Sequence, residues 1–271
     1  MSGIAVIGHL CRDVVAGSPP RPGGGVFYAT RALAQLGKDA TVAAACAADD
    51  RETLLPPLEA FGLPVRWYAS STTTAYSFHY EGDRRIMEQD AVGDPWGAAQ
   101  AVEAVGEAAW VGVCALTRSD FPPSTLEALA SDGRRLLVDA QGLVRLPALG
   151  ALRSGREIGD VLRHVTILKL NDEEAETLVG SHEPARLRSL DVPEVILTLG
   201  SRGAWVVTRD VAEHVPALPL EASGDPTGAG DTFAMAYLAS RIEGGEPVEA
   251  ARVASTVAGE HVARDDETRL A

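Results

Sequence analysis

Positive charge is scarce in this sequence. Its 24 Lys and Arg stand against 38 Asp and Glu, which gives a formal net charge of −14, and Lys38 and Lys169 are its only lysines. A surface this acidic repels nucleic acids and anionic membranes, so we expect neither as a partner. A phosphate ligand would have to be held locally, by backbone amides, an Arg or a bound cation.

Cysteine is also rare, and the three residues Cys11, Cys46 and Cys114 form no CxxC pair or Cys/His cluster. Their odd number and apolar surroundings predict reduced thiols in the core and exclude a structural zinc site. The sequence has no apolar run of about 18 residues that could cross a membrane. The start, MSGIAVIGHLCRD, lacks a basic stretch before its short apolar run. We therefore expect no signal peptide and a cytoplasmic protein.

Short apolar segments that resemble buried strands alternate with helical patterns along the chain. The composition, 46% hydrophobic over 271 residues, is enough for one large core. Strands are predicted at 3–8, 39–47, 108–115, 135–140, 166–170 and 194–200, with a terminal hairpin at 203–218 and two closing helices. This order predicts a single α/β domain over residues 1–271, a three-layer sandwich with a mostly parallel sheet covered by helices on both faces.

Residues 65–92 have a different texture, rich in Thr, Ser and aromatics, partly alternating, with a turn at Gly82-Asp83. This pattern predicts a β-hairpin that, with part of 11–22, projects from the domain as a small β-lid. Several aromatic side chains on the lid would have to be buried from solvent, namely Trp67, Tyr68, Tyr76, Phe78 and Tyr80. We therefore predict a homodimer that pairs through the lid.

The stretch SGDPTGAGDTF, residues 223–233, follows the last predicted strand. Gly228-Ala229-Gly230 allows a close backbone approach, and the helix beginning near Asp231 presents unpaired amides and a partial positive charge. Together they predict a site for an anion such as a phosphoryl group, with Asp231 placed to take a proton from a hydroxyl. The alternative is a tight turn in which Asp231 or Thr232 merely caps the helix. The length of the composite motif favours the anion site.

Three other stretches at strand ends or helix starts carry polar or glycine-rich residues. In NDEE, Asn171 and Glu174 face the same way and could hold the water shell of Mg²⁺, or could simply cap a helix with an acidic first turn. TLGSRGAW places Thr198 and two glycines in a turn that could run under a nucleotide. RPGGG offers another close-approach loop before a helix. No GxGxxG follows a strand and no GxxxxGK[ST] occurs, so neither a dinucleotide fingerprint nor a P-loop is present.

These motifs together resemble the ribokinase-like, or PfkB, carbohydrate kinase family over nearly the whole chain. DPTGAGDTF is similar to the C-terminal signature of that family, RPGGGVFYATRALAQLG to its N-terminal signature, NDEE to its N-x-x-E, and LTLGSRGAW to its nucleotide loop. The resemblance implies the ribokinase-like fold. It also implies an ATP-dependent kinase that phosphorylates a hydroxyl of a small sugar or polyol.

The resemblance also implies residue roles. Asp231 would be the general base, and the backbone of Gly228, Ala229, Gly230 and Asp231 the anion hole. The ATP site would comprise Asn171, Thr198, Gly200, Ser201, Gly203 and Ser255. Asn171 and Glu174 would hold Mg²⁺ through water, and Asp13, Gly23 and Gly24 would bind the acceptor. A monovalent cation such as K⁺ is implied at Asp225 and Thr227, although the Gly-containing turn that completes this site in the family does not follow residue 263 here.

Some positions depart from the family pattern. Tyr28 and Cys11 stand where polar acceptor-side residues are usual, and Pro226 replaces a Thr. The stretch VDAQGLVR has a faint likeness to inositol kinases, which adds Gln141 to the acceptor residues beside Tyr28. Because Tyr28 and Phe27 could stack on a base, a nucleoside kinase stays an alternative. A ligand-binding protein without transfer is the other alternative, and the retained Asp231 and glycines speak against it.

Overall fold

The computed structural model describes residues 3–15, 19–81, 84–219 and 226–270. Within them, a large sheet of nine strands forms the centre of the molecule, in the order β14-β13-β12-β11-β9-β8-β1-β4-β5. The strands are β1 (Ile4–His9), β4 (Ala40–Ala47), β5 (Val65–Ser70), β8 (Trp110–Cys114), β9 (Arg135–Asp139), β11 (Ile167–Asn171), β12 (Glu194–Thr198), β13 (Ala204–Thr208) and β14 (Ala212–Val215). The run from β5 to β12 is parallel, and β13 and β14 add an antiparallel edge.

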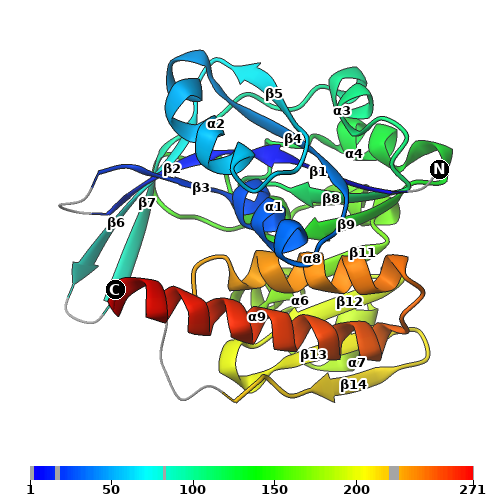
Figure 1. The fold of residues 1–271 in the computed structure, drawn as a ribbon. Coiled ribbons are helices and arrows are strands. Elements are labelled where there is room, and N and C mark those ends of the chain that lie inside the picture. The colour runs from blue at the N-terminus through cyan, green and yellow to red at the C-terminus, as the bar shows by residue number, and fades with distance from the viewer. Residues whose placement is uncertain (1–2, 16–18, 82–83, 220–225, 271) are drawn as a thin grey trace.

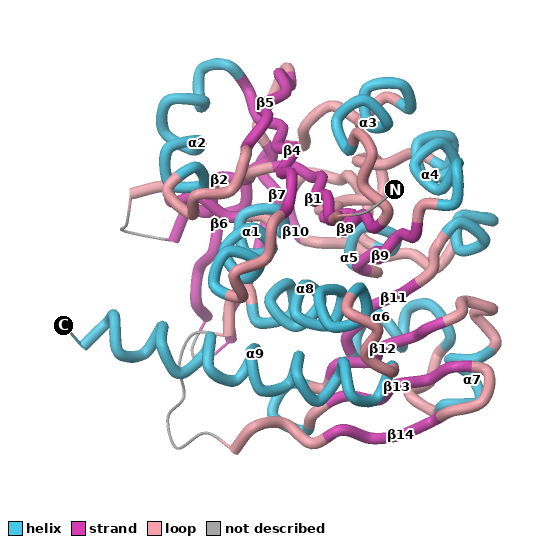
Figure 2. The backbone as a smooth tube through the Cα atoms, turned by 45° about the vertical axis from the view of Figure 1, so that its right-hand side comes forward, coloured by secondary structure: helices cyan, strands magenta, loops and turns pink. Residues whose placement is uncertain are grey.

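Helices cover both faces of this sheet, as Figures 1 and 2 show. One face packs against α1 (Gly25–Gln35), α2 (Arg51–Glu59), α8 (Ala229–Ile242) and α9 (Pro247–Leu270). The other packs against α3 (Ala98–Val105), α4 (Pro123–Ala130), α6 (Asp172–Val179) and α7 (Pro184–Arg188). Because helices cover both faces of the large sheet, its central strands are apolar throughout and do not alternate between apolar and polar residues. The three-layer α/β architecture expected from the sequence is confirmed.

A second, smaller sheet projects to one side of the molecule (Figure 1). Its strand order is β10-β7-β6-β2-β3, formed by β10 (Gly150–Ala151), β7 (Arg84–Ala91), β6 (Thr74–Glu81), β2 (Cys11–Val15) and β3 (Arg21–Gly23). A separate apolar cluster joins this lid sheet to the body, built from Cys11, Tyr76, Phe78 and Leu116. The lid therefore draws its strands from three separate parts of the chain.

The structure corrects one local expectation. Residues 65–70, predicted as part of the lid hairpin, form β5 and pair in parallel with β4 at the edge of the large sheet. An edge strand with one half-exposed face has the same alternating pattern as a lid strand, which explains the error.

All three cysteines are buried and unbonded, as the sequence suggested. None of the helices in the described ranges combines the length and the apolar character that crossing a membrane requires.

Candidate functional site

The candidate site lies at the carboxyl ends of β1, β9, β11 and β12, where α1, α5 (Gln141–Val144), α6 and α8 begin and the lid sheet meets the body. Parallel strands bring their carboxyl ends to one edge, and ligands in such folds bind outside that edge. Residues that are 200 positions apart in the chain therefore meet there.

Gly228 caps the N-terminus of α8 in a left-handed conformation, with φ of 80°. A Cβ on Gly228 would also run into the ring of Tyr28, so both backbone angle and space require glycine. The Ala229 amide donates to the Pro226 carbonyl at 3.0 Å, and the Thr232 amide donates to the Gly228 carbonyl at 2.9 Å. Within the described backbone, the amides of Gly230 and Asp231 have no such partner, so they remain as the donors at this helix N-terminus.

The Asp231 carboxyl lies between the N-termini of α8 and α1. Its Oδ1 would be 2.9 Å from a Cβ placed on Gly25, so glycine at that position leaves room for the carboxyl. Burial raises the pKa of Asp231 to about 7, with a further upward contribution from Asp139 that Lys169 and Arg145 partly offset. A carboxyl with a pKa near neutrality is suited to exchange a proton with a substrate hydroxyl.

Lys169, on β11, is buried beside the anion site. Its Nζ donates to Asp139 Oδ2 at 2.8 Å and would be 3.0 Å from a Cβ on Gly230. Burial favours the neutral amine, but Asp139 and Glu174 outweigh it and hold the pKa of Lys169 above its ordinary value. A permanent ammonium charge therefore lies next to the Gly230 backbone, in a protein whose net charge is strongly negative.

Asn171 and Glu174 form a reciprocal cap at the start of α6. The Glu174 amide donates to Asn171 Oδ1 at 2.8 Å, and the Asn171 amide donates to Glu174 Oε2 at the same distance. The helix-capping alternative is thus present in the structure, and it does not preclude a metal role. Burial, then Asp139, raises the pKa of Glu174 to about 7, and Lys169 opposes that shift.

A pocket of about 940 Å³ opens beside this cap. Its lining contains every residue that the sequence assigned to the ATP site: Asn171, Thr198, Gly200, Ser201, Gly203 and Ser255. Ala229, Gly230 and Lys169 also line it, together with apolar side chains that include Leu199, Leu218, Phe233, Ala258 and Val262. The volume and this combination of polar and apolar groups suit a nucleotide.

The predicted acceptor residues lie on the other side of Asp231. Asp13 is buried, accepts a hydrogen bond from Cys11 Sγ at 3.1 Å, and packs so closely on Gly23 that no side chain would fit there. Gly24 has φ of 96°, and a Cβ on it would be 2.6 Å from the His9 carbonyl oxygen. Burial and then Asp13 raise the pKa of Tyr28.

The remaining predicted site residues are Gln141, Asp225 and Thr227. Gln141 is half-buried at the start of α5, and its backbone amide donates to Asp139 Oδ1 at 3.0 Å. Asp225 lies outside the described residues. The carbonyl oxygen of Thr227, the other predicted cation ligand, is 2.9 Å from His261 Nε2 on α9.

The sequence did not reveal Lys169, Asp139 and Arg145. Lys169 and Asp139 are directly paired across the parallel strands β11 and β9. A lysine in the apolar stretch TILKL was the one available signal, since a charge inside a buried strand needs a partner or a function.

Comparisons with known proteins bear on this geometry. A model for the pfkB family carbohydrate kinases matches residues 3–268. The bifunctional protein HldE of Shewanella sediminis (strain HAW-EB3) is 25% identical over 256 residues, which are 90% of this chain and 52% of that protein. A deoxyribokinase of Salmonella typhi is 38% identical over 90 residues, which are 30% of this chain and 29% of that protein. The chain thus spans about half the length of the first relative, and less than a third of the second is matched.

Solved structures share the fold. A pyrophosphate-dependent kinase in the ribokinase family, complexed with a pyrophosphate analogue and myo-inositol, has a TM-score of 0.83 and 24% identity, covering 96% of this chain and 94% of its own. Arabidopsis thaliana ribokinase complexed with ribose and ATP has a TM-score of 0.75 and 19% identity. The match covers 97% of this chain and 93% of that chain. At these identities the likeness establishes the ribokinase-like fold.

Proposed function

Since this chain belongs to the pfkB family of carbohydrate kinases, we propose that it transfers the γ-phosphoryl group of ATP to a hydroxyl of a small sugar or polyol. One observation carries the proposal: Asp231, with a pKa of about 7, lies between a nucleotide-sized pocket and the residues predicted to bind the acceptor. A general base and an anion site at the junction of two binding sites are what phosphoryl transfer requires.

In the proposed reaction, the Asp231 carboxylate takes the proton of the acceptor hydroxyl as the hydroxyl oxygen attacks the γ-phosphorus. A new O–P bond forms, the bond from phosphorus to the bridging oxygen breaks, and ADP leaves with that oxygen. The amides of Gly230 and Asp231 and the ammonium of Lys169 stabilise the charge on the phosphoryl oxygens. One preorganised donor of this kind contributes roughly 3 kcal/mol to the lowering of the barrier.

Asn171 and Glu174 would hold Mg²⁺ through water beside the pocket. The residues fit such an ion, because Asp139 raises the pKa of both Glu174 and Asp231 and a cation would relieve that repulsion. Among the described residues, no group of three or more His, Cys, Asp and Glu is arranged to ligate a metal directly. When bound, Mg²⁺ supplies charge neutralisation for the phosphate chain.

The monovalent cation implied at Asp225 and Thr227 has weaker support. Carbonyl oxygens are natural ligands for such ions, but the Thr227 carbonyl already lies at hydrogen-bond distance from His261. We therefore propose that activity does not depend strongly on K⁺.

The phosphoryl donor is a separate question, because three of the similar solved structures are described as pyrophosphate-dependent kinases. Apolar residues line most of the pocket beyond the anion site, and pyrophosphate has no base to fill that space. This supports ATP over pyrophosphate.

A nucleoside acceptor has less support than a sugar or polyol. The Tyr28 ring packs on Gly228, and it meets Phe27 edge-on at a centroid distance of 5.4 Å. A ring committed to these contacts is not available to stack on a base.

The proposal is tested by incubating the purified protein with MgATP, or with magnesium pyrophosphate, and a panel of sugars, polyols and nucleosides. We expect ADP formation that depends on a sugar or polyol. A panel without acceptor-dependent ADP from MgATP and without acceptor-dependent phosphate from magnesium pyrophosphate, together with a ligand-induced thermal shift, would favour a binding protein instead.

A further inference from the structure

Two of the segments that connect the lid sheet to the body meet at a buried histidine. His9 is the last residue of β1, and β2 of the lid begins two residues later at Cys11. The His9 side chain is only 1% exposed. Its Nε2 is 2.8 Å from the carbonyl oxygen of Asp94, in the segment after β7, and a Cβ on Gly93 would be 2.9 Å from its Cδ2. His9 therefore lies at the base of the lid.

The segment after β7 is bound in turn to the segment before β6. The Asp94 carboxylate accepts the Ser71 amide at 2.6 Å and the Ser71 hydroxyl at 2.7 Å, and the Asp94 amide donates to Ser70 Oγ at 2.9 Å. The Gly93 amide donates to Thr74 Oγ1 at 2.9 Å. The contact between His9 and Asp94 therefore helps to fix the base of both long lid strands.

The other side of the His9 ring faces Asp120, in the loop after β8. Nδ1 is 3.4 Å from Asp120 Oδ2, and it has no better aligned hydrogen-bond partner in the part of the chain that the structure describes. Asp120 is fully buried and accepts the Leu116 amide at 2.8 Å and the Thr117 hydroxyl at 2.6 Å. Donors of this kind stabilise the charged carboxylate, so a negative charge faces Nδ1.

These partners determine the charge of the His9 ring. A backbone carbonyl only accepts, so Nε2 carries a proton, and a neutral ring would then turn the Nδ1 lone pair toward the Asp120 carboxylate. Burial favours the neutral ring, but Asp120 and then Asp94 outweigh it and hold the pKa of His9 above its ordinary value. The ring also contacts Trp96 and Gly93, which carry no charge.

The backbone of His9 adjoins the residues predicted to bind the acceptor. A Cβ on Gly24 would be 2.6 Å from the His9 carbonyl oxygen. The strand β2 that follows carries Asp13, whose Oδ2 would be 2.4 Å from a Cβ on Gly23. By contrast, the described residues that line the nucleotide-sized pocket include neither His9 nor Asp120. A shift of the lid base would therefore disturb the acceptor side and spare the nucleotide side.

We infer that His9 is a positioning residue that pairs with Asp120 as a buried imidazolium and so holds the lid sheet over the acceptor site. The charged ring disappears as pH rises through the His9 pKa, which lies above the ordinary 6.5, so the acceptor should bind less tightly on the alkaline side. The effect on the acceptor rests on the proposed function, but the charge of the ring does not.

Nitrogen-15 NMR of the histidine rings tests the charge without any substrate. We expect the His9 ring to titrate with a midpoint above 6.5. His9→Gln identifies its signals by their loss, and exposed His214 gives a reference signal in the same spectra. A His9 midpoint below 6.5 would overturn the inference, whatever reaction the protein catalyses.

Steady-state kinetics tests the positioning role. For His9→Gln we expect the KM for the acceptor to rise about tenfold while the KM for MgATP is unchanged. The unmodified protein should show a rise of the same kind above the His9 midpoint. Gly93→Ala keeps both charges but drives a methyl group against the His9 ring, so it should also raise the acceptor KM. Gly97→Ala, whose Cβ would meet nothing closer than 4.0 Å, is the matched control.

A double variant separates charge from packing. His9→Gln leaves Asp120 buried without its counter-charge, so adding Asp120→Asn should restore part of the lost Tm at neutral pH. Losses in Tm that simply add would contradict the ion pair.

Two further results distinguish this inference from the proposed function. Equal rises in the KM values for acceptor and MgATP would overturn the inference, because His9 would then support the whole site. If no acceptor is found, the proposed function fails on its own. Hydrogen exchange then decides: we expect faster exchange in β6 and β7 of His9→Gln than in the unmodified protein, and equal exchange would overturn the role of His9 in the lid.

Discussion

At the scale of single residues, Asp231 is the position where stability and activity conflict. Burial raises its pKa to about 7, because the charged carboxylate loses its water shell and faces Asp139. The neutral form stabilises the fold, whereas the proposed reaction requires the charged form as base. The neighbouring Lys169 and Arg145 reduce this conflict without removing it.

Activity should therefore decline on the acid side of neutrality. The carboxylate that accepts the proton disappears as pH falls through about 7, so kcat/KM should fall about tenfold for each pH unit below that value. The check is a pH profile of kcat/KM between pH 5 and 9 in buffers of constant ionic strength. A rate that stays constant down to pH 5 would argue against Asp231 as the base.

The same shift predicts that removing the charge stabilises the protein. The pKa is 3.8 for an ordinary Asp and about 7 in the folded chain. Between these pH values the folded state binds more protons than the unfolded state, so the free energy of unfolding falls as pH rises through this window. The destabilisation by the charged Asp231 reaches its full size above about pH 7. Asp231→Asn should raise Tm at pH 8 and raise it less at pH 5, with each kcal/mol worth roughly 2–4 °C in a chain of this size. An unchanged or lower Tm at pH 8 would contradict the assigned burial.

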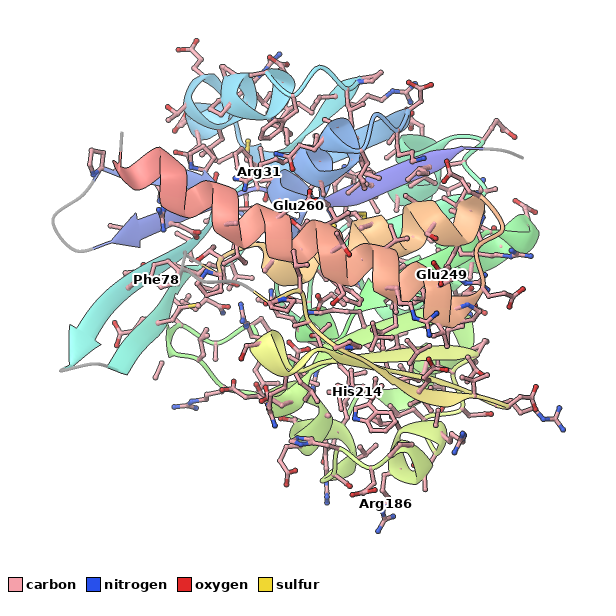
Figure 3. The ribbon with its side chains drawn as sticks, turned by 60° about the horizontal axis from the view of Figure 1, so that its bottom comes forward. Arg31, Phe78, Arg186, His214, Glu249 and Glu260 are labelled. Carbon is pink, nitrogen blue, oxygen red and sulfur yellow. The ribbon has the colours of Figure 1, made fainter. Side chains whose placement is uncertain are left out.

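At the scale of elements, the loop before α8 is held between two helices of the same layer. Tyr28 of α1 packs on Gly228, and His261 of α9 reaches the Thr227 carbonyl. Arg31 of α1 contacts His261 Nδ1 at 2.5 Å, and Figure 3 shows Arg31 and Glu260 where these two helices approach each other. A carbonyl only accepts and a guanidinium only donates. The His261 ring is therefore neutral, with its proton on Nε2.

Gly228→Ala should lower both Tm and phosphoryl transfer far more than the same change at another glycine in the left-handed conformation. Gly244 has φ of 89° but open space around it, so Gly244→Ala measures the cost of backbone strain alone. Gly228→Ala adds a collision with the Tyr28 ring, and we expect it to lower Tm further and to abolish transfer. The two variants are compared by thermal unfolding and by ADP formation. Equal effects would mean that the loop moves easily.

His261→Phe should leave the Thr227 carbonyl without this donor, at a cost of about 1–3 kcal/mol. Because the loop carries the anion site, we expect a lower kcat with little change in the KM for ATP. His261→Gln keeps an N–H donor on a side chain of similar reach and should retain more activity. If both variants have the kcat of the unmodified protein, α9 does not position the loop.

At the scale of the whole molecule, the motifs that the sequence revealed are local, and those that it missed are not. The Gly228–Asp231 loop and the Asn171–Glu174 cap each lie within a few consecutive residues, so their composition identified them. Lys169 and Asp139 become neighbours only when β11 and β9 pair, and no local pattern records that register. Likewise, β10 joins the lid from a distant segment that carries no hairpin signal.

The homodimer stays a prediction, but the residues offered for it need revision. Tyr76 and Phe78 are buried against the body, and Trp67 and Tyr68 belong to the large sheet rather than to the lid. The side chain of Tyr80 lies outside those that the structure describes. These aromatics therefore give no support to pairing of two lids.

The most direct test of the central claim, that Asp231 is the base of a phosphoryl transfer, is a comparison of Asp231→Asn with the unmodified protein. Both are assayed for acceptor-dependent ADP formation at saturating MgATP and for MgATP binding by calorimetry. We predict that transfer falls by roughly 10²–10⁴-fold while MgATP affinity is retained. Transfer at the rate of the unmodified protein would contradict the claim.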